Sequence, residues 1–309
     1  MTDERLVYKS GDFVPESEAS LSIFDSGVGS GHMVFEVTRT FNHEPFRLTG
    51  PKSHLERLHA SLRCAQIDSG MTPEELEAAT FETIERNLHH FGPDDDFWIN
   101  HYISNGTEGR PSVLIYVRSL AGVLAERAHF YDEGLDAVIP TQQSVPARLI
   151  DPKIKNTSRL YYRIADVQAK QVSPDAWALL TDEDGFITEG TGSNFMMIKD
   201  GVLISPEPRN ILLGITRGGI IDVAERIGVP FEERNIEPYD VINADEAFFS
   251  ATSVVMLPVR TVNGHPLSAE PPGPVYLRLR EGFSEMVGFD FVSQARRYAG
   301  MLNREPAAV

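Results

Sequence analysis

A succession of short apolar runs and two-residue turns in the second half of the chain constrains the fold most strongly. The run 186–189 follows the turn Asp184-Gly185, and the run 194–198 is joined to 202–204 by Asp200-Gly201. Strands separated by turns of this kind pair as hairpins, so we expect a β-rich second half. Helical periodicity predicts two helices in the same half, at 215–227 and 274–286.

The first half combines strands with two helices that carry start signals. Thr72-Pro73-Glu74-Glu75 supplies a cap, a first-turn proline and an acidic first turn, and Ser53 stands three residues before Glu56, the spacing of a capping box. Residues 120–133 show no period, so we expect an interdomain loop and mobile flap there. The strands expected in this half are 21–23, 33–40, 45–48, 97–104 and 112–119.

A glycine-rich segment lies between the first two of these strands. Gly27-Val28-Gly29-Ser30-Gly31 has the spacing GxGxG, whereas the dinucleotide-binding loop requires GxGxxG and a following helix. A tight connection between strands is therefore the favoured interpretation, and a nicotinamide-dependent dehydrogenase is disfavoured.

Composition limits the partners that the chain can have. A formal charge of −17 over 309 residues disfavours nucleic acid and anionic membranes. The single cysteine, Cys64, excludes an intramolecular disulfide and offers no zinc cluster, and no other spacing suggests a metal. The longest nearly apolar run, 247–259, is too short to span a bilayer, and the charged N-terminal residues hold no signal segment. We therefore expect a cytoplasmic protein.

The stretch 151–170, DPKIKNTSRLYYRIADVQAK, places a lysine directly before a predicted helix. Leu160, Ile164 and Val167 recur at i, i+4 and i+7, which predicts a face packed on a core, with Ser158 as its cap. Lys155 precedes that helix and can point into a cleft. Most lysines in such a position are solvated, so the chemistry of the rest of the chain has to decide its role.

Five chemically informative positions follow one another along the chain: Arg57, Lys155, Glu189, the pair Ile215-Thr216, and Thr252. With their surroundings they resemble the pyridoxal-phosphate aminotransferases of fold type IV, which include branched-chain, D-amino acid and (R)-amine transaminases. The matching stretches are Val34-Phe35-Glu36, Phe46-Arg47-Leu48, His54-Leu55-Glu56-Arg57-Leu58, Ile154-Lys155-Asn156, Ile187-Thr188-Glu189-Gly190-Thr191-Gly192-Ser193-Asn194-Phe195, Leu212-Leu213-Gly214-Ile215-Thr216-Arg217, Ala244-Asp245-Glu246-Ala247-Phe248, Ser250-Ala251-Thr252 and Pro258-Val259.

The resemblance implies a role for each of these positions in holding pyridoxal 5'-phosphate. Lys155 would tether the cofactor and then carry a proton as general acid–base. Glu189 would lie against the ring nitrogen and keep it protonated. A helix start offers N–H groups and a positive dipole end to a phosphate. The remaining cofactor contacts would be Arg57, Ile215, Thr216 and Thr252 at the phosphate, and Leu212 beneath the ring.

The substrate positions depart from the family patterns. Branched-chain enzymes carry an arginine where this chain has Asn100, and tyrosines where it has Leu160 and Ser30; D-amino acid transaminases carry an arginine where it has Asn105. Burying a carboxylate without a cation costs on the order of several kcal/mol. One usual carboxylate clamp is therefore absent, or is rebuilt by Arg39, Arg118, Arg127 or Arg159. The candidate substrate contacts are Phe35, Arg39, Trp98, Arg127 and Ser253.

The resemblance also implies the architecture and the activity. We expect an α+β protein, with a small N-terminal α/β domain at 1–119, the interdomain loop at 120–133, and a pseudo-barrel domain at 134–309 that carries the cofactor lysine. The expected function is a homodimeric transaminase that moves an amino group from an (R)-amine or D-amino acid to an α-keto acid. Branched-chain L-amino acid transamination, aminodeoxychorismate lyase activity and a non-catalytic binding protein are the alternatives.

Overall fold

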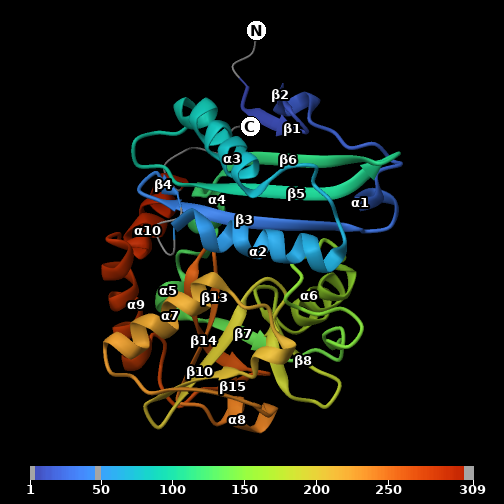
Figure 1. Ribbon diagram of the computed structural model, residues 1–309. Helices are drawn as coiled ribbons and strands as arrows, with labels where there is room; N and C mark the ends of the chain where they lie inside the picture. Colours follow the sequence, from blue (N-terminus) through green and yellow to red (C-terminus); the bar gives the residue numbers. More distant parts are fainter. Residues whose placement is uncertain (1–3, 46–49, 303–309) are drawn as a thin grey trace. The chain divides into compact units, whose positions relative to one another are not determined.

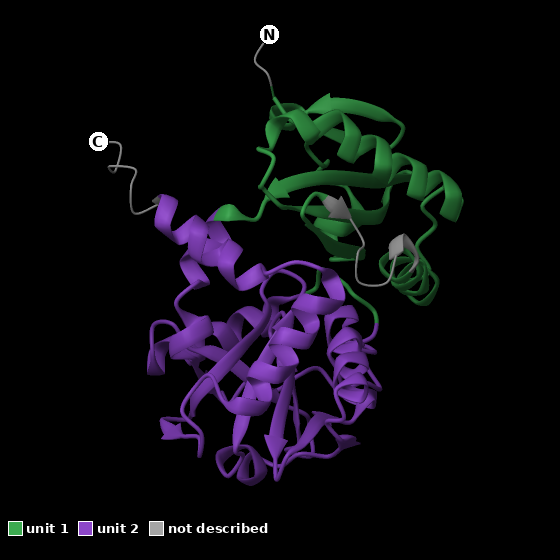
Figure 2. Ribbon diagram, turned by 90° about the vertical axis from the view of Figure 1, so that its left-hand side faces the viewer, with its two compact units in different colours: residues 1–121, 154–158 green, residues 122–153, 159–309 purple. Residues whose placement is uncertain are grey.

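The computed structural model describes residues 4–45 and 50–302. Within these ranges the chain folds into two compact units. Unit 1 consists of residues 1–121 together with 154–158, and unit 2 consists of residues 122–153 together with 159–309 (Figure 2). The predicted division at residues 119 and 134 differs from these limits, because the segment with Lys155 groups with unit 1. Each unit is described by itself.

Unit 1 is built on a six-stranded antiparallel sheet with the strand order β2-β1-β6-β5-β3-β4 (Figure 1). The expected strands at 33–40, 97–104 and 112–119 are confirmed, and each of them extends further. Residues 46–48 of the expected strand at 45–48, which include the motif Phe46-Arg47-Leu48, lie outside the described residues. The strands are β1 Leu6–Lys9, β2 Asp12–Pro15, β3 Met33–Phe41, β4 Glu44–Pro45, β5 Phe97–Thr107 and β6 Arg110–Ser119.

Two helices, α2 (Gly50–Ala65) and α3 (Pro73–Asn87), pack with one face of this sheet around a single core. The core is made by leucines of α2 and α3, such as Leu58 and Leu76, and by the inward side chains of β5 and β6. The start of α3 is a capping box, as the sequence predicted: Thr72 accepts from the N–H of Glu75, whose side chain accepts from the N–H of Thr72. A 3-10 turn, η2 (Leu88–His90), follows α3.

Two local predictions in unit 1 are wrong. Residues 21–23 form no strand but lead, after η1 (Glu16–Glu18), into the helical turn α1 (Ser26–Gly29), which contains part of the glycine-rich segment. Asp25 caps this turn by accepting from the N–H of Gly27, and a buried cap outweighs the weak strand propensity of the short run. Ser53 lies inside α2 and is not its cap, because the helix begins three residues earlier.

The segment 154–158 extends the chain along β3. Val34 and Asn156 form an antiparallel bridge, the N–H of Phe35 donates to the carbonyl of Lys155 at 2.9 Å, and the N–H of Thr157 donates to Met33 at 3.0 Å. These bonds satisfy the backbone of an otherwise irregular segment, and they explain why it belongs to unit 1.

Unit 2 contains a nine-stranded sheet that closes on itself (Figure 1). The strand order is β12-β11-β10-β13-β14-β7-β8-β9, and the additional pairing of β9 with β10 makes the ring that was expected as a pseudo-barrel. The predicted hairpin strands are confirmed. The strands are β7 Leu135–Val138, β8 Trp177–Thr181, β9 Ile187–Gly190, β10 Asn194–Lys199, β11 Val202–Pro206, β12 Phe231–Arg234, β13 Glu246–Ala251, β14 Val255–Val262 and β15 His265–Pro266.

Helices complete unit 2, and two of them contradict the expected loop at 120–133. That segment forms α4 (Ala121–Arg127) and α5 (Phe130–Glu133), because buried side chains such as Leu124 and Tyr131 anchor it where no regular period is visible. A helix also follows the one that was expected to be last. The remaining helices are α6 Leu160–Val172, η3 Pro208–Asn210, α7 Ile215–Arg226, α8 Pro238–Ile242, α9 Pro274–Val287 and α10 Phe291–Leu302.

Helix α6 forms as predicted, but with the opposite face packed. Leu160, Ile164 and Val167 are 74, 41 and 55% exposed, whereas Ala165 and Ala169 are fully buried. The alanines contribute to a core cluster with side chains of β7 and β8, and small residues allow the helix to approach these strands closely. The predicted cap is also wrong: the N-cap position is Arg159, and the hydroxyl of Ser158 donates to Gly31.

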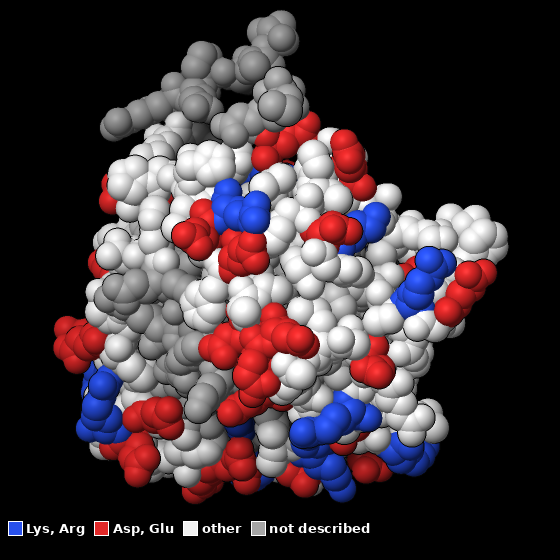
Figure 3. Space-filling view, turned by 45° about the horizontal axis from the view of Figure 1, so that its top comes forward, with Lys and Arg blue, Asp and Glu red and all other residues white. Residues whose placement is uncertain are grey.

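Acidic side chains are spread over the face shown in Figure 3, with Lys and Arg interspersed among them, in keeping with the net charge of −17. Within the ranges that the structure describes, no helix combines the length and the apolar character needed to cross a membrane.

Candidate active site

Lys155 is held in unit 1 by its own backbone. Its N–H donates to the hydroxyl of Ser61 on α2 at 3.1 Å, and its carbonyl accepts from Phe35 on β3. The Nζ atom lies 4.7 Å from the centre of the Phe35 ring. A cation or amine over an aromatic face has a defined position and partial shielding from water. The lysine and one predicted substrate residue are therefore neighbours.

Arg57, predicted as a phosphate contact, lies in a buried cluster of charged groups in the same unit. Its Nε and Nη2 atoms donate to the two oxygens of Glu36 at 2.9 and 2.6 Å, and His54 contacts the same carboxylate at 3.1 Å. Burial alone would raise the pKa of Glu36, but the charge of Arg57 and the hydrogen bonds hold it well below its usual range. Burial lowers the pKa of His54, which leaves that ring neutral at pH 7.

Phe35 begins a row of aromatic rings on the face of the sheet opposite to the core. Phe35 stacks on Tyr102 with ring centres 5.6 Å apart, and Tyr102 stacks on Tyr116 at 6.0 Å. Asn100 lies on the same face, since Val37 opposes it next to the Phe35–Tyr102 pair. The amide nitrogen of Asn100 is buried and has no hydrogen-bond partner among the described residues.

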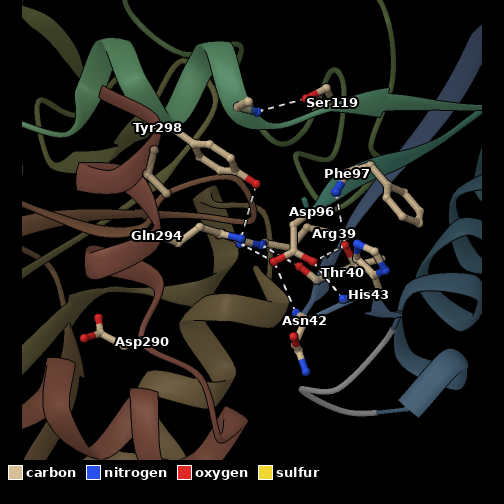
Figure 4. Close-up of polar contacts among 12 residues, drawn as sticks. Arg39, Thr40, Asn42, His43, Asp96, Phe97, Ser119, Asp290, Gln294 and Tyr298 are labelled. Atoms are coloured by element: carbon tan, nitrogen blue, oxygen red, sulfur yellow. Dashed lines mark hydrogen bonds and ion pairs between the residues drawn. The ribbon is translucent and has the colours of Figure 1, made fainter. Parts of the chain in front are cut away.

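Arg39 and Trp98, both predicted substrate contacts, oppose each other on this face. The guanidinium of Arg39 lies 4.2 Å over the ring of Phe41, and its side chain is 1% exposed, with Asp96 at 3.7 Å. Asp96 also accepts from the hydroxyl of Thr40 at 2.5 Å (Figure 4). Arg39 is thus engaged within unit 1 at the end of β3 away from Phe35.

Glu189, the predicted partner of the ring nitrogen, lies on β9 in unit 2 and is 5% exposed. Three neutral groups donate to its carboxylate. The hydroxyl of Tyr162 lies 2.8 Å from Oε1, while the amide of Asn194 and the N–H of Leu212 lie 3.2 and 2.9 Å from Oε2. Hydrogen bonds of this kind favour the ionised form of a buried carboxylate.

The start of α7 lies in the same neighbourhood. Gly214 is its N-cap and has no side chain to occupy the first N–H groups of the helix, which include those of Ile215 and Thr216. A Cβ atom on Gly214 would lie 2.0 Å from Oδ1 of Asn194. The amide of Asn194 in turn donates to the carbonyl of Leu212 at 2.7 Å. Asn194 therefore couples Glu189 to the loop that leads into the helix.

Thr252 and Ser253 follow β13 at the same end of the barrel. Asn194 opposes both Glu189 on β9 and Ser250 on β13, and Thr252 comes two residues after Ser250. The hydroxyls of Ser193 and Ser250 are buried without a hydrogen-bond partner among the described residues. Buried hydroxyls without partners are uncommon, and they indicate a place where a further polar group fits.

Arg127, predicted to lie on a mobile flap, ends the helix α4. Its guanidinium is 5.4 Å from the centre of the Trp177 ring, and burial lowers its pKa. The structure therefore gives Arg127 a packed position in unit 2.

Some of the residues that shape these two neighbourhoods were missed by sequence reasoning as functional positions. Glu36, His54 and Asn194 belong to the motifs that carry the family resemblance, so the signal was present but their partners were not visible. Tyr162 had no signal, because the apolar period of α6 directed attention to the opposite face of the helix.

Comparison with known protein families matches residues 33–262 to Amino-transferase class IV. The chain belongs to this family. A putative branched-chain-amino-acid aminotransferase of Methanocaldococcus jannaschii is 30% identical over 291 residues, which cover 91% of this chain and 96% of that protein. A D-alanine aminotransferase of Staphylococcus aureus strain N315 is 28% identical over 91% of this chain and 97% of its own length.

Solved structures agree with the fold of this class IV aminotransferase. A branched-chain amino acid aminotransferase of T.th., in complex with N-(5'-phosphopyridoxyl)-L-glutamate, matches with a TM-score of 0.82 and 26% identity. The match covers 97% of this chain and 98% of that one. The chain thus has the two-part architecture of fold type IV, is a transaminase, and uses pyridoxal 5'-phosphate.

The groups in unit 2 fit this cofactor. A helix start without a side-chain cap suits a phosphate, the buried hydroxyl of Ser250 offers a further donor, and the ionised Glu189 suits a protonated ring nitrogen. In unit 1, Lys155 supplies the amine over Phe35.

Proposed function

We propose that this aminotransferase moves an amino group from an (R)-amine or a D-amino acid to an α-keto acid. Lys155 is the proposed catalytic residue and moves the proton at the substrate carbon. Glu189 holds the proton at the ring nitrogen, and Arg57, Ile215, Thr216 and Thr252 bind the phosphate, with Leu212 under the ring. When bound, the cofactor supplies an electron sink and carries the nitrogen between the two half-reactions.

The observation that carries the choice of donor is the neutral side chain of Asn100. It lies on the same strand face as Phe35, the neighbour of Lys155, and its buried amide nitrogen has no hydrogen-bond partner in the part of the chain that the structure describes. A substrate carboxylate placed against this face would pair with an amide and not with a guanidinium. An uncharged group, or a carboxylate of the opposite hand held elsewhere, is favoured there.

Branched-chain L-amino acid transamination is the second candidate. Relatives and solved structures with that name cover nearly all of the chain, and Phe35 lies beside Lys155 as the Val-Phe-Glu motif requires. The two candidates differ in the hand of the donor and in how its carboxylate is held. Aminodeoxychorismate lyase activity differs from both, because a lyase releases pyruvate without a keto acid acceptor.

A half-reaction screen distinguishes these candidates. The purified protein loaded with pyridoxal 5'-phosphate is mixed with single donors, (R)-1-phenylethylamine, D-leucine and L-leucine, and the loss of its visible absorbance is followed. We expect rapid loss with the first two and little with L-leucine. Reaction with L-leucine alone would contradict the proposal and support the branched-chain candidate. Lys155→Ala is expected to abolish every one of these reactions; a non-catalytic binding protein would show none of them in the wild type.

We also propose that the protein acts as a homodimer in the cytoplasm. Leu160, Ile164 and Val167 form an exposed apolar row on α6, and Leu149 and Ile150, 69 and 41% exposed, add to the apolar surface of unit 2. Contiguous apolar surface on a folded chain is typical of an interface between subunits.

A further inference from the structure

The first observation is the way in which the Glu189 carboxylate is bonded. Its two oxygens are approached from different elements: Oε1 by the hydroxyl of Tyr162 on α6, and Oε2 by Asn194 on β10 and by the backbone of Leu212. The two donors to Oε2 lie on the side of the α7 loop. Tyr162 is thus the donor that holds the other oxygen, and it fixes the rotation of the carboxylate about its last bond.

The second observation is that the Tyr162 hydroxyl is itself well defined as a donor. Burial, and then the charge of Glu189, raise the pKa of Tyr162 well above its usual value, so the phenol stays protonated. The guanidinium of Arg159 lies 5.0 Å from the centre of the same ring. The ring therefore has a partner on its face as well as one at its hydroxyl.

The third observation is that α6 is attached to the β9–β10 turn by further contacts. Arg159 donates to the carbonyl of Thr191, and the hydroxyl of Thr191 donates to Asp166 at 2.6 Å. Thr191 follows Glu189 by two residues. The helix and the strand that carries Glu189 are therefore connected at three positions along one helix face, which sets the distance from the tyrosine to the carboxylate.

We propose that Tyr162 is a positioning residue that aims the Glu189 carboxylate at the ring nitrogen of pyridoxal 5'-phosphate and keeps that carboxylate ionised. This inference rests on the proposed cofactor role of Glu189. A donor to the ionised carboxylate lowers its affinity for a proton, so the shared proton stays on the ring nitrogen. Because the donors are in place before the cofactor arrives, binding requires no reorganisation of the carboxylate.

The test compares cofactor affinities of the apoenzyme. Tyr162→Phe removes only the hydroxyl, and keeps the ring on which Arg159 rests. We expect the Kd for pyridoxal 5'-phosphate to rise about tenfold, the size expected for one hydrogen bond to a charged group. The Kd for the 1-deaza analogue, which lacks the ring nitrogen, should be the same in Tyr162→Phe and wild type. In a Glu189→Gln background, Tyr162→Phe should have no further effect on either Kd.

Tyr276→Phe is the matched control, because that buried phenol donates to the carbonyl of Met256 at 3.1 Å in the same unit. It should lower the Tm as Tyr162→Phe does and leave both cofactor affinities unchanged. An unchanged affinity for pyridoxal 5'-phosphate in Tyr162→Phe, or an equal loss with the analogue, would overturn the inference while leaving the proposed function intact. A wild-type protein that bound neither cofactor nor analogue would overturn the proposed function as well.

Discussion

At the scale of single residues, the two neighbourhoods treat charge in opposite ways. In unit 1 the Glu36 carboxylate is neutralised by a guanidinium, whereas in unit 2 three neutral groups donate to the Glu189 carboxylate. A carboxylate paired with an arginine has little affinity left for a further cation. One that is stabilised by neutral donors keeps its negative charge for a protonated ring nitrogen. Structural and functional roles are therefore separated by the type of partner.

We predict that Glu36→Gln strongly destabilises the protein. The substitution leaves Arg57 and its charge buried without a counterion, which costs about 3–5 kcal/mol. Thermal or urea unfolding measures the loss. The matched control is Glu82→Gln, which breaks the exposed pair with Arg86 on α3 and should cost no more than about 0.5 kcal/mol. Equal losses for the two variants would show that the Glu36–Arg57 pair contributes no more than a surface pair.

At the scale of elements, the start of α7 joins the fold to the proposed phosphate site. Gly214 has φ −67°, a value open to any residue, so its lack of a side chain is required by space and not by backbone conformation. The atom that occupies this space is Oδ1 of Asn194, whose amide bonds to both Glu189 and Leu212. One glycine thus permits the packing that aligns the carboxylate with the helix start.

We predict that Gly214→Ala displaces Asn194 and weakens cofactor binding at least tenfold, since a hydrogen bond to the carboxylate is lost. The measurement is titration of the apoenzyme with pyridoxal 5'-phosphate. Gly218→Ala in the same helix is the control. Nothing lies within 4 Å of a Cβ atom there, so that change should leave affinity unaltered and stabilise the helix by about 0.5–1 kcal/mol. Identical cofactor affinities of the two variants would refute the role given to Gly214.

Elements were also where prediction from sequence succeeded and failed most clearly. The strands of both units and the capped helix α3 were found, because alternation, turn residues and caps are local signals. Helices α4 and α5 were missed, since their burial depends on residues far away in the chain. The packed face of α6 was assigned to the wrong side because leucine, isoleucine and valine carried the period while the buried face holds alanines.

At the scale of the whole molecule, the exposed row of α6 gives a prediction about assembly. The double substitution Ile164→Ser and Val167→Ser should convert the proposed dimer into monomers, since it removes apolar area from the interface. Sedimentation velocity or light scattering reports the mass. Tyr239→Ser on α8, 72% exposed in the same unit, is the control and should leave the mass unchanged. A wild type of monomeric mass, or a double variant that stays dimeric, would contradict the proposed interface.

The sequence by itself determined the family, the order of the strands and the residues that can carry the chemistry, because motifs and hairpin signals are local. Only the tertiary structure decided the partners of those residues. It paired Arg57 with Glu36, placed Phe35 beside Lys155, and brought the hydroxyl of Tyr162 to Glu189. Each of these contacts joins residues that lie far apart along the chain. No pattern read along the sequence reports such contacts, because they arise from the packing of elements against one another.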